Sequence, residues 1–225
     1  MIKAVIFDMD GVLLDSERLY RRYWLETAKQ YGIPREDMVR ICERIAGGSP
    51  AHTKEVFAEA FGADFPFAEM RGRVLEALDR HVKEHGINVK PGIPELLRFL
   101  QEHKVKIGLA TSTEESRAVR SLEQAGILPY FDGCMFGNRV KNSKPAPDIY
   151  LAACELVGVS PAEAMGVEDS INGMFACIHA GMTAVMVIDL IQPTQELRQQ
   201  ADRIYESARQ IMEHWDEFAD NIVIQ

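Results

Sequence analysis

The sequence predicts an α/β fold in which helices cover both faces of a parallel sheet, with an all-helical segment inserted after the first strand. From residue 91 onward, short apolar runs alternate with helical patterns, as in repeated β-α units. These runs are apolar throughout, which is typical of strands that are buried on both faces. Residues 16–90 are helical and charged, so the isolated apolar run at residues 3–8 (KAVIFD) must join the later strands in one sheet.

The inserted segment is expected to contain helices whose ends are marked by glycine and proline. The expected spans are residues 16–31, 34–45, 50–61 and 66–85. Gly32 and Gly86 close the first and the last, because a glycine commonly follows a helix C-terminus. Ser49 and Pro50 have the order of an N-cap and a first helical residue, which predicts the start of the third helix.

The remainder of the chain alternates between strand and helix. Strands are expected at residues 106–111, 134–137, 164–168, 183–188 and 203–205. Helices are expected between them and at the end of the chain, with the clearest at residues 93–103, 147–157 and 170–180. Ser112 with Glu115, and Ser160 with Glu163, have the spacing of a capping box, which predicts a helix after Ser112 and a very short helix after Ser160.

These elements define two domains. Residues 1–15 and 91–225 are expected to form a Rossmann-like three-layer core around the parallel sheet, because the first strand buries nothing alone. Residues 16–90 are expected to form a separate helical domain that interrupts the core after its first strand.

Composition excludes several classes of function. The chain of 225 residues is 47% hydrophobic and 26% charged, which is ordinary for a globular protein, and its net charge is -9. An acidic protein is a poor candidate for binding nucleic acid or an anionic membrane, and no apolar run reaches the length of about 18 residues of a transmembrane helix. The four cysteines form no C-x-x-C pair, and no signal peptide is evident, so a cytoplasmic protein is expected. The default expectation is a monomer.

The residues that follow the expected strands carry the chemistry, because parallel strands present their carboxyl ends to one ligand-binding edge. They are Asp8 and Asp10, Thr111 and Ser112, Lys144, and Glu168 and Asp169. Oxygen ligands without a nearby histidine or cysteine suit Mg²⁺, and a lysine with hydroxyl groups before a helix N-terminus suits a phosphate. Each signal alone also fits a turn, a helix cap or a solvated loop. Their conjunction predicts Mg²⁺-assisted phosphoryl transfer.

Four segments at these positions resemble the motifs of the haloacid dehalogenase-like hydrolase superfamily. They are residues 5–13 (VIFDMDGVL), 110–112 (ATS), 144–147 (KPAP) and 166–170 (GVEDS), in the order of that superfamily. The resemblance covers essentially the whole chain, because residues 16–90 look like the cap domain of the superfamily. The most similar branch is that of β-phosphoglucomutase and the phosphatases of sugar phosphates and phosphoglycolate.

The resemblance implies a role for each of the candidate residues. Asp8 is expected to be the nucleophile that forms an aspartyl-phosphate, and Asp10 the general acid and base. Dehalogenases of the superfamily lack the second aspartate, so phosphoryl transfer is expected. The phosphoryl group is expected to be held by Thr111, the Ser112 backbone and Lys144. Mg²⁺ is expected to be held by Asp8, the Asp10 carbonyl and Asp169, with Glu168 assisting.

Two positions favour hydrolysis of a small phosphomonoester over a mutase reaction. Mutases of this branch usually carry a histidine on the first cap helix, where this chain has Tyr20, and an arginine just after the glycine-containing cap loop, where it has Pro50. Arg44 lies close enough in sequence to replace that arginine, so a β-phosphoglucomutase-like sugar phosphomutase stays the alternative. A non-catalytic protein that binds a phosphorylated metabolite is a minor alternative, because Asp8 and Lys144 are both present.

The cap is expected to lie over the site and to set specificity. The residues expected to contact the substrate are Tyr20, Arg44, Gly47, Gly48 and Ser49. A sugar phosphate or a similar small metabolite is the expected partner. A hexose phosphate, a pentose phosphate, phosphoglycolate, a nucleoside monophosphate and pyrophosphate are all compatible with the sequence.

Overall fold

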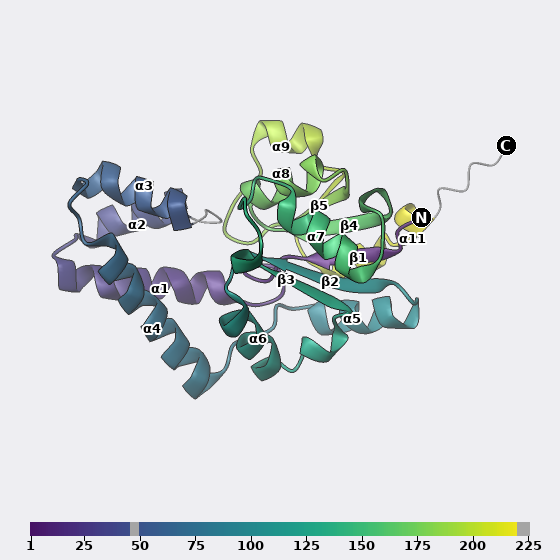
Figure 1. Cartoon of the computed structure of the whole chain (residues 1–225), viewed down its shortest axis with the longest axis horizontal. Helices are drawn as coiled ribbons and strands as arrows, with labels where there is room; N and C mark the ends of the chain where they lie inside the picture. Colours follow the sequence, from purple (N-terminus) through teal and green to yellow (C-terminus); the bar gives the residue numbers. More distant parts are fainter. Residues whose placement is uncertain (46–49, 220–225) are drawn as a thin grey trace.

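A computed structural model describes residues 1–45 and 50–219 of the chain. Figure 1 shows an α/β body that contains the sheet and a helical body beside it. No helix in the described ranges has both the length and the apolar composition needed to cross a membrane.

Within the described residues the sheet has the strand order β3-β2-β1-β4-β5-β6, and all neighbouring strands are parallel. The strands are β1 (Ala4–Phe7), β2 (Lys106–Thr111), β3 (Gly133–Phe136), β4 (Ala164–Glu168), β5 (Thr183–Val187) and β6 (Arg203–Tyr205). The first strand in sequence lies in the middle of the sheet, where Phe7 aligns with Leu109 of β2 and with Val167 of β4. The strand order reverses at β1, so ligands are expected to bind beyond its carboxyl end.

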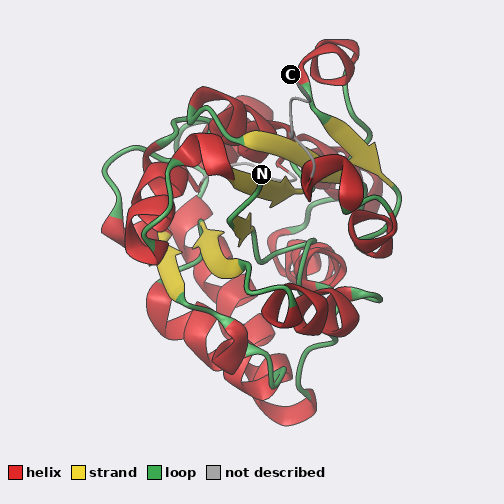
Figure 2. Cartoon of the chain, turned by 90° about the vertical axis from the view of Figure 1, so that its right-hand side faces the viewer, coloured by secondary structure: helices red, strands yellow, loops and turns green. Residues whose placement is uncertain are grey.

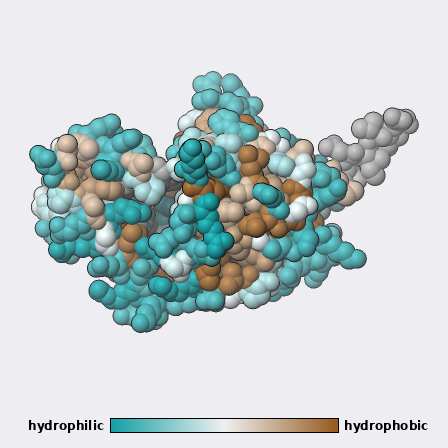
Figure 3. All heavy atoms as spheres, in the orientation of Figure 1, coloured by the Kyte–Doolittle hydropathy of each residue, from teal (hydrophilic) through white to brown (hydrophobic). Residues whose placement is uncertain are grey.

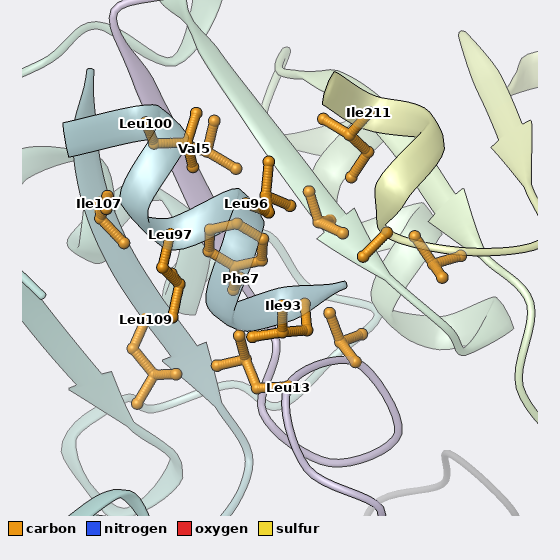
Figure 4. Packing of buried hydrophobic residues seen from close by; sticks show 14 of the residues in the cluster. Val5, Phe7, Leu13, Ile93, Leu96, Leu97, Leu100, Ile107, Leu109 and Ile211 are labelled. Carbon is orange, nitrogen blue, oxygen red and sulfur yellow. The ribbon is translucent and has the colours of Figure 1, made fainter. Parts of the chain in front are cut away.

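Helices cover both faces of the sheet (Figure 2), and successive residues of β1 face opposite layers. Val5 and Phe7 belong to one hydrophobic cluster, whereas Ala4 and Ile6 belong to another. Figure 4 shows Val5 and Phe7 beside residues of α5, with Ile211 of α10 in the same cluster. The first cluster includes residues of α5 (Ile93–Glu102), α6 (Glu115–Gln124) and α10 (Arg209–Glu213); the second includes residues of α7 (Asp148–Val157), α8 (Ile171–His179) and α9 (Gln195–Gln200).

The inserted segment has its own hydrophobic core. Trp24 is 1% exposed, and its ring centroid lies 5.0 Å from that of Phe57, while Met38 and Met70 are fully buried in the same cluster. Figure 3 shows a mainly hydrophilic surface over this domain and more hydrophobic atoms over the α/β body. Its helices are α1 (Ser16–Ala28), α2 (Arg35–Ile45), α3 (Pro50–Phe61) and α4 (Phe67–His85), with a 3-10 turn, η1 (Lys29–Tyr31), after α1.

The two linkers between the domains run side by side. Leu14 and Val89 form an antiparallel bridge. The Asp15 N–H donates to the Asn88 carbonyl at 2.9 Å, and the Lys90 N–H donates to the Leu13 carbonyl at 2.8 Å. The helical domain is therefore attached to the core by a short two-stranded ribbon at the edge of the sheet that carries the carboxyl ends.

The predicted fold class, an α/β core with an inserted helical cap domain, is confirmed. The strands predicted at residues 106–111, 164–168 and 203–205 have the observed bounds. The domain boundaries at residues 15/16 and 90/91 stay a prediction, and the predicted N-cap Ser49 lies outside the described residues.

Neither capping box forms its side-chain hydrogen bond, although the very short helix predicted after Ser160 is present as a 3-10 turn, and one helix was not predicted. Ser112 does not start a helix: α6 begins at Glu115, no side chain caps it, and Ser112 lies in the preceding loop. Ser160 precedes only a 3-10 turn, η4 (Pro161–Glu163), and makes no capping hydrogen bond through its side chain. The unpredicted helix is α9, at whose start Thr194 Oγ1 accepts from the Leu197 N–H at 3.2 Å. Its sequence signal is Thr194 directly after a proline.

Candidate active site

A cavity of about 640 Å³ lies between the carboxyl edge of the sheet and the helical domain. Asp8, Asp10, Lys144 and Asp169 line it from the core, although they come from three separate regions of the sequence. The helical domain contributes Glu17, Tyr20, Arg21, Trp24 and Arg71, among others. The structure therefore brings the predicted strand-end residues together under the inserted domain.

Lys144 is a buried cation with three hydrogen-bond partners. Its Nζ donates to Asp8 Oδ1 at 2.5 Å, to Glu168 Oε1 at 2.6 Å and to the Ala110 carbonyl at 2.9 Å. Burial alone would lower the pKa of Lys144, but the charges of Asp8 and Glu168 raise it above the ordinary value. Lys144 therefore stays protonated beside Asp8, where it can screen the charge of a phosphoryl group.

Glu168 is held by donors on both of its oxygens. Oε1 accepts from Lys144 and from the buried Tyr150 hydroxyl at 2.8 Å. Oε2 accepts from the Ser170 hydroxyl at 3.0 Å, and from the N–H groups of Asp169 at 3.2 Å and Ser170 at 3.3 Å. A Cβ at Gly173 would lie 1.9 Å from Glu168 Cδ, so this glycine permits the close approach of α8. Glu168 is thus fixed in one orientation.

Asp8, Glu168 and Asp169 form an acidic group at the base of the cavity. One carboxylate oxygen of each lies within 4.8 Å of the others, and within residues 1–45 and 50–219 this is the one group of histidine, cysteine, aspartate or glutamate side chains with such metal-binding spacing. Burial raises the pKa of Asp8 and of Asp169 well above the usual range, and Glu168 raises both further. A cation would relieve this repulsion, and an all-oxygen donor set fits Mg²⁺.

Gly11 allows Asp169 to reach this position. Its φ of +83° is in the region that favours glycine, and a Cβ there would lie 2.0 Å from Asp169 Oδ2. The turn after β1 and the carboxylate after β4 therefore pack directly against each other.

Asp10 is anchored by two hydroxyl groups that were not predicted from the sequence. The Ser16 hydroxyl donates to Asp10 Oδ1 at 2.5 Å, and the Thr113 hydroxyl donates to Oδ2 at 2.7 Å. Ser16 is the first residue of α1, and Thr113 lies in the loop after β2. Because Thr113 follows Thr111 by two residues, the sequence could have placed its hydroxyl in the same strand-end loop. The contact of Ser16 with Asp10 depends on the tertiary fold and has no such signal.

The predicted phosphate-binding residues lie at different depths. Thr111 is fully buried, and its Oγ1 accepts from the Thr113 N–H at 3.1 Å, so it shapes the loop. Ser112 is exposed and lines the cavity. A Cβ at Gly137 would lie 2.3 Å from the Ser112 carbonyl oxygen, which shows how closely the end of β3 packs against this loop.

The predicted cap residues have different locations. Tyr20 lines the cavity, and its ring lies edge-on to Trp24 with the centroids 5.7 Å apart. Burial raises the pKa of Tyr20, and Arg71 partly opposes this shift. Arg44 is not among the residues that line the cavity; it forms an ion pair with Glu59 on the solvent side. Gly47, Gly48 and Ser49 lie outside the described residues.

Several charged residues that line the cavity were not predicted from the sequence. Arg21 and Arg71 come from the helical domain. An ion pair between Arg117 of α6 and Asp79 of α4 links the core to the helical domain, with Arg117 Nη2 2.8 Å from Asp79 Oδ1. Burial, followed by the charges of Asp10 and Asp189, raises the pKa of Glu17 to about 7.

Fold and site define a class of protein, and the sequence comparisons identify the same class. The model of the haloacid dehalogenase-like hydrolase family matches residues 2–181, so the chain belongs to this family. Its enzymatic class is that of the phosphoric monoester hydrolases. The predicted resemblance is confirmed.

Relatives with named activities include phosphatases and a mutase. The chain is 37% identical over 185 residues to a phosphorylated carbohydrates phosphatase of Thermotoga maritima, covering 82% of this chain and 84% of the relative. It is 31% identical over 194 residues to β-phosphoglucomutase of Bacillus subtilis, covering 83% of each. The crystal structure of CbbY from Rhodobacter sphaeroides in complex with phosphate is similar with a TM-score of 0.78 at 27% identity, covering 94% of this chain and 96% of that one.

Proposed function

We propose that this chain is a Mg²⁺-dependent phosphatase that hydrolyses a small phosphomonoester, a sugar phosphate or a similar metabolite, through an aspartyl-phosphate. The observation that carries the proposal is the placement of Asp8, Lys144 and Asp169 at the base of one cavity. A nucleophilic carboxylate, a buried cation and a second carboxylate are the groups that this chemistry needs.

The residues fit the proposed metal. Asp8, the Asp10 carbonyl and Asp169 would hold Mg²⁺. Glu168 would assist through its position beside Asp169, because its own oxygens already accept from several donors. When bound, Mg²⁺ supplies positive charge that lets the anionic Asp8 approach an anionic phosphate.

In the first proposed step an Asp8 carboxylate oxygen attacks phosphorus, and the bond from phosphorus to the ester oxygen breaks. Protonated Asp10 gives its proton to that oxygen, which leaves as an alcohol. Lys144 and the Ser112 backbone would hold the phosphoryl oxygens, and buried Thr111 would support their loop.

In the second step the Asp10 carboxylate takes a proton from water as the water oxygen attacks phosphorus. The bond between phosphorus and Asp8 breaks, which releases phosphate and restores the Asp8 carboxylate. The Ser16 and Thr113 hydroxyls hold Asp10 in one place for both proton transfers.

The substrate class is supported by the walls of the cavity and by the relatives. Glu17, Tyr20, Arg21 and Arg71 offer donors and acceptors in the helical domain, as hydroxyl groups of a sugar would require. The phosphatase of Thermotoga maritima, named for phosphorylated carbohydrates, supports the same class. We further propose that the protein is a cytoplasmic monomer; its four cysteines are free, as a reducing compartment requires.

A sugar phosphomutase remains the second candidate because one relative is a β-phosphoglucomutase. Such an enzyme must grip a second phosphate group. Arg44, the residue expected to replace the missing cap arginine, is engaged with Glu59 outside the cavity. This arrangement favours hydrolysis.

The test is Mg²⁺-dependent release of phosphate from a panel of sugar phosphates, phosphoglycolate, nucleoside monophosphates and pyrophosphate. We expect Asp8→Asn to reduce release at least about a thousandfold, because it removes the nucleophile. Asp64→Asn, at an exposed position, is the matched control and should retain activity. Conversion of a sugar 1-phosphate to its 6-phosphate without release would establish the mutase instead. Silence in both assays with intact Mg²⁺ binding would leave a non-catalytic binding protein.

A further inference from the structure

Asp189 is a buried carboxylate that contacts the second linker and the first turn of α1, where the helical domain begins. It lies two residues beyond the end of β5, and its side chain is 2% exposed. Its Oδ1 accepts from Lys90 Nζ at 2.5 Å and from an Arg18 guanidinium nitrogen at 3.4 Å. Lys90 ends the second linker, and Arg18 lies in the first turn of α1. One side chain of the core thus holds both the second linker and the first turn of the helical domain.

The other oxygen of Asp189 distinguishes this contact from an ordinary ion pair. Oδ2 is buried and has no hydrogen-bond partner among the described residues. An unpaired buried oxygen is costly, so a contact that serves stability alone would be expected to use both oxygens. Arg18 is 55% exposed and shares its guanidinium group with Asp15 at 3.3 Å. A small approach of α1 would let Arg18 donate to both oxygens of Asp189.

The first turn of α1 is also where the helical domain touches the catalytic machinery. Ser16, two residues before Arg18, donates to Asp10 Oδ1 at 2.5 Å. The linker that leads into this turn is tied to the second linker by the hydrogen bond from the Asp15 N–H to the Asn88 carbonyl. A shift of the first turn would therefore move the Ser16 hydroxyl relative to Asp10.

We propose that Asp189 is a positioning residue: by holding Lys90 and Arg18 it sets the first turn of α1, and through Ser16 it orients Asp10 for proton transfer. This rests on the function proposed above for Asp10. Asp189 does not itself line the cavity. Its effect falls on the proton transfers of Asp10, and single-turnover release of the alcohol isolates the first of them, the protonation of the leaving oxygen.

The activity test compares two leaving groups in single-turnover experiments. A sugar alkoxide needs the proton of Asp10, whereas p-nitrophenolate leaves without one. We expect Asp189→Asn to slow release of the alcohol from the preferred sugar phosphate about 10- to 100-fold, as a displaced general acid would, and to leave p-nitrophenolate release within about twofold. Lys90→Met should have the same selective effect, and Lys90→Arg should restore most of the rate.

The control is Asp132→Asn, which weakens the ion pair of Asp132 with Lys106 at the opposite edge of the sheet. Lys106 Nζ and Asp132 Oδ1 lie 2.7 Å apart. We expect Asp132→Asn to have no selective effect on the release of either leaving group. Equal slowing of both leaving groups in Asp189→Asn, or slowing of neither, would overturn the proposal. If Asp189→Asn does not fold, Lys90→Met replaces it, and the same two results would overturn the proposal.

Amide hydrogen exchange makes the test independent of turnover. We expect Asp189→Asn to accelerate exchange of the Asp15 and Lys90 N–H groups, which bond across the linkers, while Asp132→Asn leaves them unchanged. Unchanged exchange in Asp189→Asn would also overturn the proposal. If the parent protein hydrolyses no ester, the proposed phosphatase function fails, and the exchange experiment still decides whether Asp189 holds the linkers.

Discussion

The carboxyl edge of the sheet and the solvent side of the helical domain both carry ion pairs, but they hold them differently. At the sheet edge Lys144 is buried and bonded to Asp8, Glu168 and a carbonyl. In the helical domain the Arg44–Glu59 pair is about half exposed. The first region fixes a few groups in one geometry, as reaction chemistry requires. The second leaves this ion pair solvated, so it can rearrange at low cost.

The difference has a simple energetic cause. A charge at the sheet edge is removed from water, so the fold is stable only when that charge has all of its ion-pair and hydrogen-bond partners. An ion pair on a helix surface gains little over hydration and can be rearranged at low cost. Variants in the two regions should therefore have effects of different size.

The largest contrast is expected between the two ion pairs. Lys144→Met leaves Asp8 and Glu168 buried without their cation, so the free energy of unfolding at about pH 8 should fall by about 3–5 kcal/mol. Arg44→Met should change it by less than about 1 kcal/mol. Urea unfolding measures both. Equal losses would mean that burial does not separate the two regions.

A second contrast compares two glycines with positive φ. Gly32→Ala at φ +67° has no atom within 4 Å of the new Cβ, so it should cost about 1–2 kcal/mol of conformational strain and leave phosphate release unchanged. Gly11→Ala at φ +83° adds a clash with Asp169, and phosphate release should fall at least about tenfold. Thermal melts and turnover of both variants check this, and full activity in Gly11→Ala would show that Asp169 can move freely.

The third prediction concerns pH and Mg²⁺ at the sheet edge. The raised pKa of Asp8 and Asp169 means that the metal-free native protein holds protons that the unfolded chain has released, between the usual aspartate pKa of about 3.9 and the raised values. The contribution of these groups to stability therefore falls as pH rises through that window. Mg²⁺ needs both carboxylates ionised, so its stabilising effect should grow as pH rises, reaching about 2.7 kcal/mol at a concentration about 100 times its Kd.

Thermal melts with Mg²⁺ and with a chelator, between about pH 6 and about pH 8, measure this effect. Asp169→Asn is the control: it removes one ligand and one buried charge, so the Mg²⁺ increment should disappear at every pH. If the increase in Tm on adding Mg²⁺ were the same at every pH, protons and Mg²⁺ would not compete for these carboxylates.

The smallest effect is expected in the helical domain. Arg71→Ala removes a donor from the cavity wall and should raise KM for a sugar phosphate about tenfold, the loss of one charged hydrogen bond, with kcat within about twofold. Arg44→Ala, which lies outside the cavity, should leave both constants unchanged. Initial-rate kinetics on both variants show which of the two arginines contacts the substrate. The reverse result would support the sequence-based prediction that Arg44 contacts the substrate.

The sequence by itself determined the sheet and the edge at which the candidate site residues lie. Buried parallel strands are continuous apolar runs, and the residues that follow them must meet at one edge, so Asp8, Lys144 and Asp169 could be placed before any coordinates. Capping boxes were less informative, because a serine and a glutamate at that spacing also occur in loops, as Ser112 does.

Only the tertiary structure decided which side chains support these residues. Ser16 reaches Asp10 from the inserted domain, Tyr150 reaches Glu168 from a helix on the sheet, and Asp189 reaches Lys90 and Arg18 from beyond the end of β5. None of these residues follows its partner in a short motif. Likewise, Arg71 faces the cavity and Arg44 does not, because the packing of the helices sets their rotation. Short-range order is encoded in local patterns, whereas contacts between distant segments depend on how the domains pack.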